Sequence, residues 1–215
     1  MEALWNNLDR IMNDLLKQWN VPGISIALVQ DGKILDVRGY GKRDLEQDLP
    51  MTGDTVMPIG SVTKSFTALL LGMLADEGKL DFDRPVRDYI PWLKLWDPAT
   101  TRDLLCHRTG VPRYDMQVAF NALKDRKEQV GTFQYLQPSA DFRTVLQYSN
   151  QMVTLAGYLA EVLTGQTWEE LVKERILQPL GMDHSDFEVD SLTKYEDTSK
   201  GYVFTGTGHM EAGYM

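Results

Sequence analysis

The stretch Ile59-Gly60-Ser61-Val62-Thr63-Lys64-Ser65-Phe66 opens a segment that continues to Asp76 with apolar residues at helical spacing. Residues three positions apart on a helix lie on the same side, about 5–6 Å apart, so the Lys64 amine can reach the Ser61 hydroxyl. Ser61 also stands at the helix start, where unpaired N–H groups and the helix dipole stabilise an oxyanion. The pattern predicts a nucleophilic serine activated by a lysine. A helix N-cap followed by a solvated lysine explains the same spacing, because Ser-x-x-Lys arises often by chance.

A second motif, Tyr148-Ser149-Asn150, precedes another helical pattern further along the chain. Tyrosine has a pKa near 10 and becomes a usable base when a lysine ammonium stands beside it. An asparagine can orient that lysine and hold a substrate amide. Taken alone, the motif describes a loop tyrosine and an N-cap asparagine. The two motifs together predict one site in which the Lys64 amine and the Tyr148 hydroxyl lie within about 3–4 Å of the Ser61 oxygen.

The N-terminal part predicts one helix and one hairpin. Apolar residues at steps of three and four indicate an amphipathic helix that ends at Pro22-Gly23 (Leu4, Leu8, Ile11, Met12, Leu15 and Trp19). Residues 24–30 and 33–39 read as strands around Asp31-Gly32, a dipeptide that accepts the positive φ angles of a tight turn. Residues 40–54 read as a loop.

The rest of the chain predicts mainly helices. Prolines divide residues 77–140 into short pieces, with a short helix at 101–106. Helical spacing returns at 150–163 and ends at Gly165, and a capping box of Thr167 with Glu170 opens a helix over 168–177. Residues 205–209 are too rich in glycine for a strand and read as a flexible surface loop.

Composition and charge exclude several classes of function. The chain has 22 basic and 31 acidic residues, a formal net charge of -9, and no basic cluster, so nucleic acid is not an expected partner. No apolar run is long enough to span a membrane. As written, without a cationic and apolar leader, the chain is expected in the cytoplasm; removal of a signal peptide would make it periplasmic or secreted.

Its one cysteine, Cys106, is expected to be a small buried apolar residue. Neither a metal nor another cofactor is expected, because the histidines share no ligand spacing (His107, His184 and His209).

Six motifs in this order make the chain resemble the class C β-lactamase-like and penicillin-binding-protein-like serine hydrolases, a family that includes β-lactamase-fold esterases, DD-peptidases and D-aminopeptidases. The motifs are Val21-Pro22-Gly23, Asp31-Gly32-Lys33, the Ser61 and Tyr148 motifs quoted above, Asp103-Leu104-Leu105-Cys106-His107-Arg108-Thr109-Gly110, and Pro179-Leu180-Gly181-Met182. The resemblance implies that Ser61 is acylated, that Lys64 and Tyr148 share general-base and general-acid duty, and that Asn150 positions Lys64 and substrate. Which of the two is the acylation base stays open, because they titrate as a coupled pair.

The chain departs from this family at two places. The family's His-Thr-Ser-Gly turn reads His107-Arg108-Thr109-Gly110, and Arg108 is expected to point into solvent. The family's third element, a Lys-Thr-Gly or His-x-Gly triplet on an edge strand, is absent, and Thr205-Gly206-Thr207-Gly208-His209 is rejected as its equivalent because it is too rich in glycine. We therefore expect a second chain or a C-terminal fragment to complete the sheet.

The resemblance implies an α+β fold in which helices flank an antiparallel sheet, with a mostly helical block and with the C-terminal strands of the sheet missing. Residues 1–57 are expected to contribute a helix and hairpin to the sheet, residues 58–182 to form the helical block, and residues 183–215 to return toward the sheet. The implied function is a serine hydrolase that attacks an ester, amide or β-lactam carbonyl of a small molecule or peptide. The competing hypothesis is a non-catalytic penicillin-binding-like protein that binds a peptide, a cell-wall fragment or a partner protein.

Overall fold

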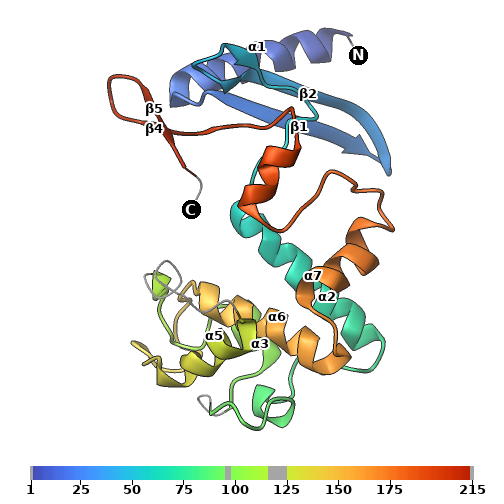
Figure 1. The fold of residues 1–215 in the computed structure, drawn as a ribbon, viewed down its shortest axis with the longest axis vertical. Coiled ribbons are helices and arrows are strands. Elements are labelled where there is room, and N and C mark those ends of the chain that lie inside the picture. The colour runs from blue at the N-terminus through green and yellow to red at the C-terminus, as the bar shows by residue number, and fades with distance from the viewer. Residues whose placement is uncertain (1, 95–97, 116–124, 214–215) are drawn as a thin grey trace. The chain divides into compact units, whose positions relative to one another are not determined.

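The computed structural model describes residues 2–94, 98–115 and 125–213 (Figure 1). The chain divides into two units. One consists of Met1–Pro58 together with Asp186–Met215, and the other of Ile59–Ser185. The second unit contains all four residues predicted to form the catalytic site.

The first unit is built on a three-stranded antiparallel sheet. Helix α1 (Glu2–Trp19) precedes strands β1 (Gly23–Gln30), β2 (Lys33–Asp44) and β3 (Leu49–Pro50), which lie in the order β1-β2-β3. Both residues of the predicted turn have positive φ, 51° at Asp31 and 72° at Gly32, as the Asp-Gly pair requires. The prediction of a loop over residues 40–54 is wrong for its first part, because β2 continues to Asp44 and pairs with β3.

Residues 186–213 are joined to the rest of the first unit by main-chain hydrogen bonds, among them one of 2.9 Å from the Lys200 N–H to the Arg43 carbonyl in β2. The Val56 N–H donates to the Asp197 carbonyl at 2.9 Å, and the Ser199 N–H donates to the Val56 carbonyl at 3.0 Å. The segment begins with η5 (Val189–Lys194), and β4 (Gly201–Phe204) and β5 (His209–Ala212) follow as an antiparallel hairpin. This hairpin is a separate two-stranded sheet, and of residues 205–209, which were expected to be a loop, only His209 belongs to a strand. The glycines of residues 205–208 lie in the hairpin turn, outside two strands that are too short to show an alternating pattern.

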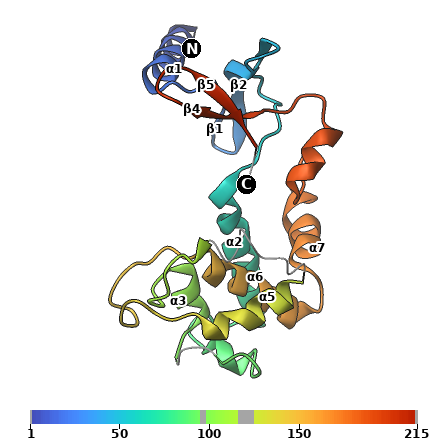
Figure 2. The ribbon, with the colours of Figure 1, turned by 60° about the vertical axis from the view of Figure 1, so that its left-hand side comes forward.

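The second unit is a cluster of helices around α6. A 3-10 turn, η1 (Gly60–Val62), leads into α2 (Thr63–Asp76), which packs against α6 (Asn150–Thr164) and α7 (Trp168–Val172) (Figures 1 and 2). Helices α3 (Thr101–Leu105) and α5 (Arg126–Thr132) also pack against α6. Short turns complete the unit: η2 (Val86–Asp88), η3 (Phe133–Tyr135) and the π-helical η4 (Lys173–Leu177). The core contains large, fully buried apolar side chains (Leu70, Leu71, Leu74, Leu104, Phe133, Met152, Leu155 and Leu159).

Local signals set the ends of these helices. Gly165 ends α6 in the left-handed conformation, with φ 77°. Thr167 and Glu170 form the predicted capping box at the start of α7. Cys106, in contrast, is exposed at the C-cap of α3, so the expectation that it is buried is wrong. At this end of the helix Leu104 is buried in the core and Cys106 lies on the exposed side.

Gly39 in β2 offers a test of the sheet packing. A Cβ built at Gly39 would lie 2.2 Å from the Met51 carbonyl oxygen, which is backbone and cannot move aside cheaply. We predict that Gly39→Ala lowers the free energy of unfolding of the first unit by about 3 kcal/mol. The matched control is Gly208→Ala, where a Cβ meets nothing within 4 Å. Chemical denaturation of both variants measures the difference, and equal stabilities would contradict this packing.

Candidate active site

Ser61, Lys64 and Tyr148 are brought together in the second unit. Lys64 lies on the first turn of α2, and its amine donates a hydrogen bond of 3.0 Å to the Ser61 hydroxyl oxygen. The Tyr148 hydroxyl is hydrogen-bonded to the same Ser61 oxygen at 2.5 Å. Both distances agree with the spacing predicted from the two motifs. The Ser61 oxygen thus has two groups beside it that can exchange its proton.

The surroundings of Tyr148 favour its ionised form. The Lys64 amine lies 4.8 Å from the centre of the tyrosine ring, and the Arg113 guanidinium carbon lies 5.3 Å from it. Hydrogen bonds from Lys64 and then Ser61, assisted by both positive charges, lower the pKa of Tyr148 below its usual value. A phenol with a lowered pKa is a better base at neutral pH, because more of it is ionised.

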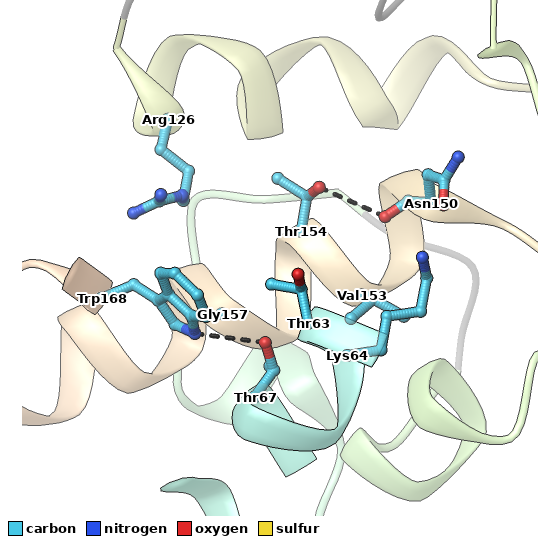
Figure 3. Close-up of a pocket in the computed structure, with 9 residues that line it drawn as sticks. All are labelled: Thr63, Lys64, Thr67, Arg126, Asn150, Val153, Thr154, Gly157 and Trp168. Carbon is cyan, nitrogen blue, oxygen red and sulfur yellow. Dashed lines mark hydrogen bonds between the residues drawn. The ribbon is translucent and has the colours of Figure 1, made fainter. Parts of the chain in front are cut away.

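Asn150 begins α6 and lines the same cavity as Lys64 (Figure 3). Its side-chain nitrogen donates a hydrogen bond of 3.1 Å to Asp115, and Asp115 pairs with Arg113 at 2.7 Å. The role expected for Asn150, positioning Lys64 and substrate, stays a prediction. Sequence reasoning missed Arg113 and Asp115; the signal was their position a few residues after the His107 turn, in Val111-Pro112-Arg113-Tyr114-Asp115.

Arg108 does not point into solvent as expected. Its guanidinium donates to the fully buried carboxylate of Asp103 at 2.5 Å, and Arg143 donates two hydrogen bonds to the same carboxylate at 2.9 and 2.8 Å. Burial alone would raise the pKa of Asp103, but the hydrogen bonds from Arg143, Thr100 and Arg108 hold it well below its usual range. Arg108 turns inward because a buried carboxylate needs compensating charge.

A cavity of about 210 Å³ lies beside Lys64, between α2, α6 and α7 (Figure 3). The Trp168 indole N–H closes one side by donating to the Thr67 hydroxyl at 3.1 Å. Arg126 stands at another side, where it pairs with Glu161 and Glu169. The lining combines hydroxyl, amide and cationic groups with an aromatic surface (Thr63, Lys64, Thr67, Arg126, Asn150, Val153, Thr154, Gly157 and Trp168). The cavity could hold a small polar group of a substrate.

Across the described residues, no cluster of three or more histidine, cysteine, aspartate or glutamate side chains is arranged to hold a metal ion. In the same ranges, no helix has the length and apolar character that crossing a membrane requires.

A family model described as Beta-lactamase matches residues 8–210, and the chain therefore belongs to the β-lactamase family. It is 35% identical over 222 aligned positions to the unguisins hydrolase ungD' of Aspergillus campestris, covering 96% of this chain and 41% of that protein. It is 33% identical over 185 positions to the teichoic acid D-alanine hydrolase of Staphylococcus aureus, covering 86% of this chain and 45% of the relative.

Among solved structures, the octameric penicillin-binding protein homologue from Pyrococcus abyssi superposes with a TM-score of 0.84 at 31% identity, covering 99% of this chain and 51% of that one. The predicted α+β fold of the β-lactamase and DD-peptidase type is thereby confirmed. The chain spans about half the length of the relatives it matches. The expected second chain or fragment that completes the sheet stays a prediction.

The effect of Lys64 on Tyr148 can be measured directly. We predict that Lys64→Met raises the pKa of Tyr148 toward 10, because the hydrogen bond and charge that favour the phenolate are lost. Tyrosine labelled with ¹³C at Cζ would report the titration by NMR, with the Tyr148 signal assigned from Tyr148→Phe. Lys79→Met, which removes a lysine paired with Glu77, is the control and should leave the signal unchanged. A Tyr148 titration that is the same in the wild type and Lys64→Met would contradict the geometry.

Proposed function

We propose that this chain carries the nucleophile and the proton-transfer groups of a serine hydrolase that cleaves an ester or amide through an acyl-enzyme on Ser61. The observation that carries the proposal is the Ser61 oxygen, which is hydrogen-bonded both to the Lys64 amine and to the Tyr148 hydroxyl. A structural serine at a helix start has no need of a lysine and a tyrosine on its side-chain oxygen. Membership of a family whose similar members are named hydrolases supports the same conclusion.

In the proposed reaction, the Lys64–Tyr148 pair takes the Ser61 proton as the serine oxygen attacks the substrate carbonyl carbon. The pair then gives that proton to the departing alcohol or amine, and the carbon–oxygen or carbon–nitrogen bond to the leaving group breaks. Water, deprotonated by the same pair, attacks the carbonyl carbon of the acyl-enzyme. The ester bond to Ser61 then breaks, the pair returns the proton to the serine oxygen, and the carboxylic acid leaves. The positive end of α2 lies next to Ser61 and favours the negative charge that develops on the carbonyl oxygen.

For the substrate, we propose an ester or amide of a D-amino acid. The support is the similarity to a teichoic acid D-alanine hydrolase over most of this chain. Asn150 and Lys64 form one end of the 210 Å³ cavity, so a small polar side chain or amino group on the α-carbon, next to the carbonyl carbon, could enter it. In this proposal Asn150 holds the substrate through its amide, which Asp115 orients.

Covalent labelling tests the nucleophile. A fluorophosphonate probe should add once, to the peptide that contains Ser61, and Ser61→Ala should abolish the adduct in intact-mass spectra. Ser65→Ala is the matched control, because the Ser65 hydroxyl donates to the Val62 carbonyl and takes no part in the proposed reaction. Tyr148→Phe should slow labelling by about 10²–10⁴-fold, the usual contribution of a positioned acid or base. Labelling that survives Ser61→Ala would refute the assignment, and a protein that never labels would favour the non-catalytic binding protein.

The substrate proposal predicts stereoselectivity. The value of kcat/KM for D-alanine p-nitroanilide should exceed that for the L-enantiomer by about tenfold or more, which corresponds to about 1.4 kcal/mol of transition-state stabilisation. Parallel assays with p-nitrophenyl acetate and nitrocefin separate a general esterase and a β-lactamase from a D-amino acid hydrolase. Equal rates on the two enantiomers, or a preference for the L form, would overturn the substrate class while leaving the Ser61 nucleophile intact.

A further inference from the structure

His107 binds the backbone on both sides of Tyr148. The Gln147 N–H donates to the His107 carbonyl oxygen at 2.7 Å, and the Ser149 N–H donates to His107 Nδ1 at 3.2 Å. The imidazole ring also packs on the Tyr148 ring, with the two centroids 4.6 Å apart and the planes at 35°. His107 therefore contacts the residues before and after Tyr148 and also the tyrosine ring itself.

The hydrogen bond at Nδ1 requires one form of the imidazole. An atom that accepts an N–H must carry a lone pair, so His107 is neutral with its proton on Nε2. In the imidazolium both nitrogens are donors, and the Ser149 N–H would lose its acceptor. Because Ser149 is fully buried, water cannot easily replace that acceptor.

The turn that carries His107 is itself fixed. His107 has φ 55°, in the left-handed region. The next residue, Arg108, accepts the Arg143 N–H on its carbonyl oxygen at 2.8 Å, and the side chains of both arginines converge on the buried Asp103. The His107 turn and the segment that leads into Tyr148 are thus joined at several points.

The charges around the imidazole oppose its protonation. Burial, and then the positive charge of Lys64 on α2, lower the pKa of His107 below its usual value of about 6.5. Arg113 lies over the Tyr148 ring and adds positive charge on that side of the site. Arg108 is directed at Asp103, and Tyr148 is the titratable group in direct ring contact with His107. The neutral form is therefore retained at neutral pH and lost as the pH falls through the lowered pKa.

We infer that His107 is a positioning residue for Tyr148: through the 147–149 backbone, its neutral imidazole holds the tyrosine hydroxyl against Ser61. This inference rests on the proposed function, in which Tyr148 takes part in proton transfer. Protonation of His107 releases the Ser149 N–H and loosens the placement of Tyr148. Acylation of Ser61 then requires two deprotonated groups, the Lys64–Tyr148 pair and His107.

Two variants distinguish the hydrogen-bond acceptor of His107 from the packing of its ring on Tyr148. In His107→Asn the side-chain oxygen can occupy the place of Nδ1 and accept the Ser149 N–H, does not titrate, and suits the left-handed backbone. His107→Phe keeps an aromatic ring against Tyr148 and removes the acceptor. We expect His107→Asn to keep kcat within about threefold of the wild type, and His107→Phe to lower kcat by about 5- to 150-fold with little change in KM, which corresponds to the 1–3 kcal/mol of an unpaired buried N–H.

The pH dependence of the labelling rate tests the inference further, because a purely structural role of His107 would not add a second step to it. As the pH is lowered, the logarithm of the labelling rate of Ser61 in the wild type should first fall with slope one, because the Lys64–Tyr148 pair is protonated. Below about pH 6.5, where His107 is protonated as well, the slope should steepen toward two. In His107→Asn the slope should stay at one. A second step that persists in His107→Asn, or a His107→Phe enzyme with wild-type kcat, would overturn the inference.

Two further measurements keep the result unambiguous. If Tyr148→Phe labels as fast as the wild type, the proposed function fails; if Tyr148→Phe is slow while His107→Phe is normal, the role of His107 alone fails. Long-range ¹H–¹⁵N NMR of the imidazoles reads the tautomer without any activity, and it stays informative if His107→Phe does not fold. His107 should show an unprotonated Nδ1 at neutral pH, and a proton on Nδ1 would overturn the inference.

Discussion

The packing of α6 against α2 is the constraint on which the candidate site depends. Both helices start at the site: α2 begins directly after Ser61 and carries Lys64 in its first turn, and α6 begins directly after Tyr148 and Ser149. Their apolar faces hold the two starts together, because side chains such as Leu71 and Leu155 are fully buried and each contributes about 1.5–3 kcal/mol. The 2.5 Å contact between Ser61 and Tyr148 is thus set by the core of the helical unit.

Charged residues also hold the segments around the candidate site and set its electrostatics. Asp103 is a buried anion that binds two arginines and joins the His107 turn to the segment before Tyr148. On the other side, Lys64 and Arg113 surround the tyrosine ring with positive charge and favour its phenolate. Burial, and then the charge of Lys64, lower the pKa of His107 and so favour its neutral form. Asn150 is held by Asp115 at the start of α6, which brings an amide to the edge of the cavity.

The sequence predicted what local rules decide. The i, i+3 spacing of Ser61 and Lys64 and the helix start after Tyr148 predicted that these three side chains lie together, as they do. The Asp31-Gly32 turn and the Thr167 capping box follow from backbone chemistry. The contacts of Asp115 and His107 were missed because their partners are distant in sequence. Arg108 was placed wrongly since the burial of Asp103 is a tertiary property, and the β4–β5 hairpin was missed because its strands have only four residues each.

The central claim is that Ser61 attacks a carbonyl with Lys64 and Tyr148 on its oxygen. A crystal structure with a D-alanine boronic acid tests it most directly, because boron forms a reversible tetrahedral adduct with an activated serine and imitates the acylation intermediate. The account predicts a covalent bond from boron to Ser61 Oγ, with the Lys64 amine and the Tyr148 hydroxyl within about 3.2 Å of that oxygen or a boronate oxygen. A boronic acid bound to another residue, or an adduct on Ser61 from which Lys64 and Tyr148 both turn away, would contradict it.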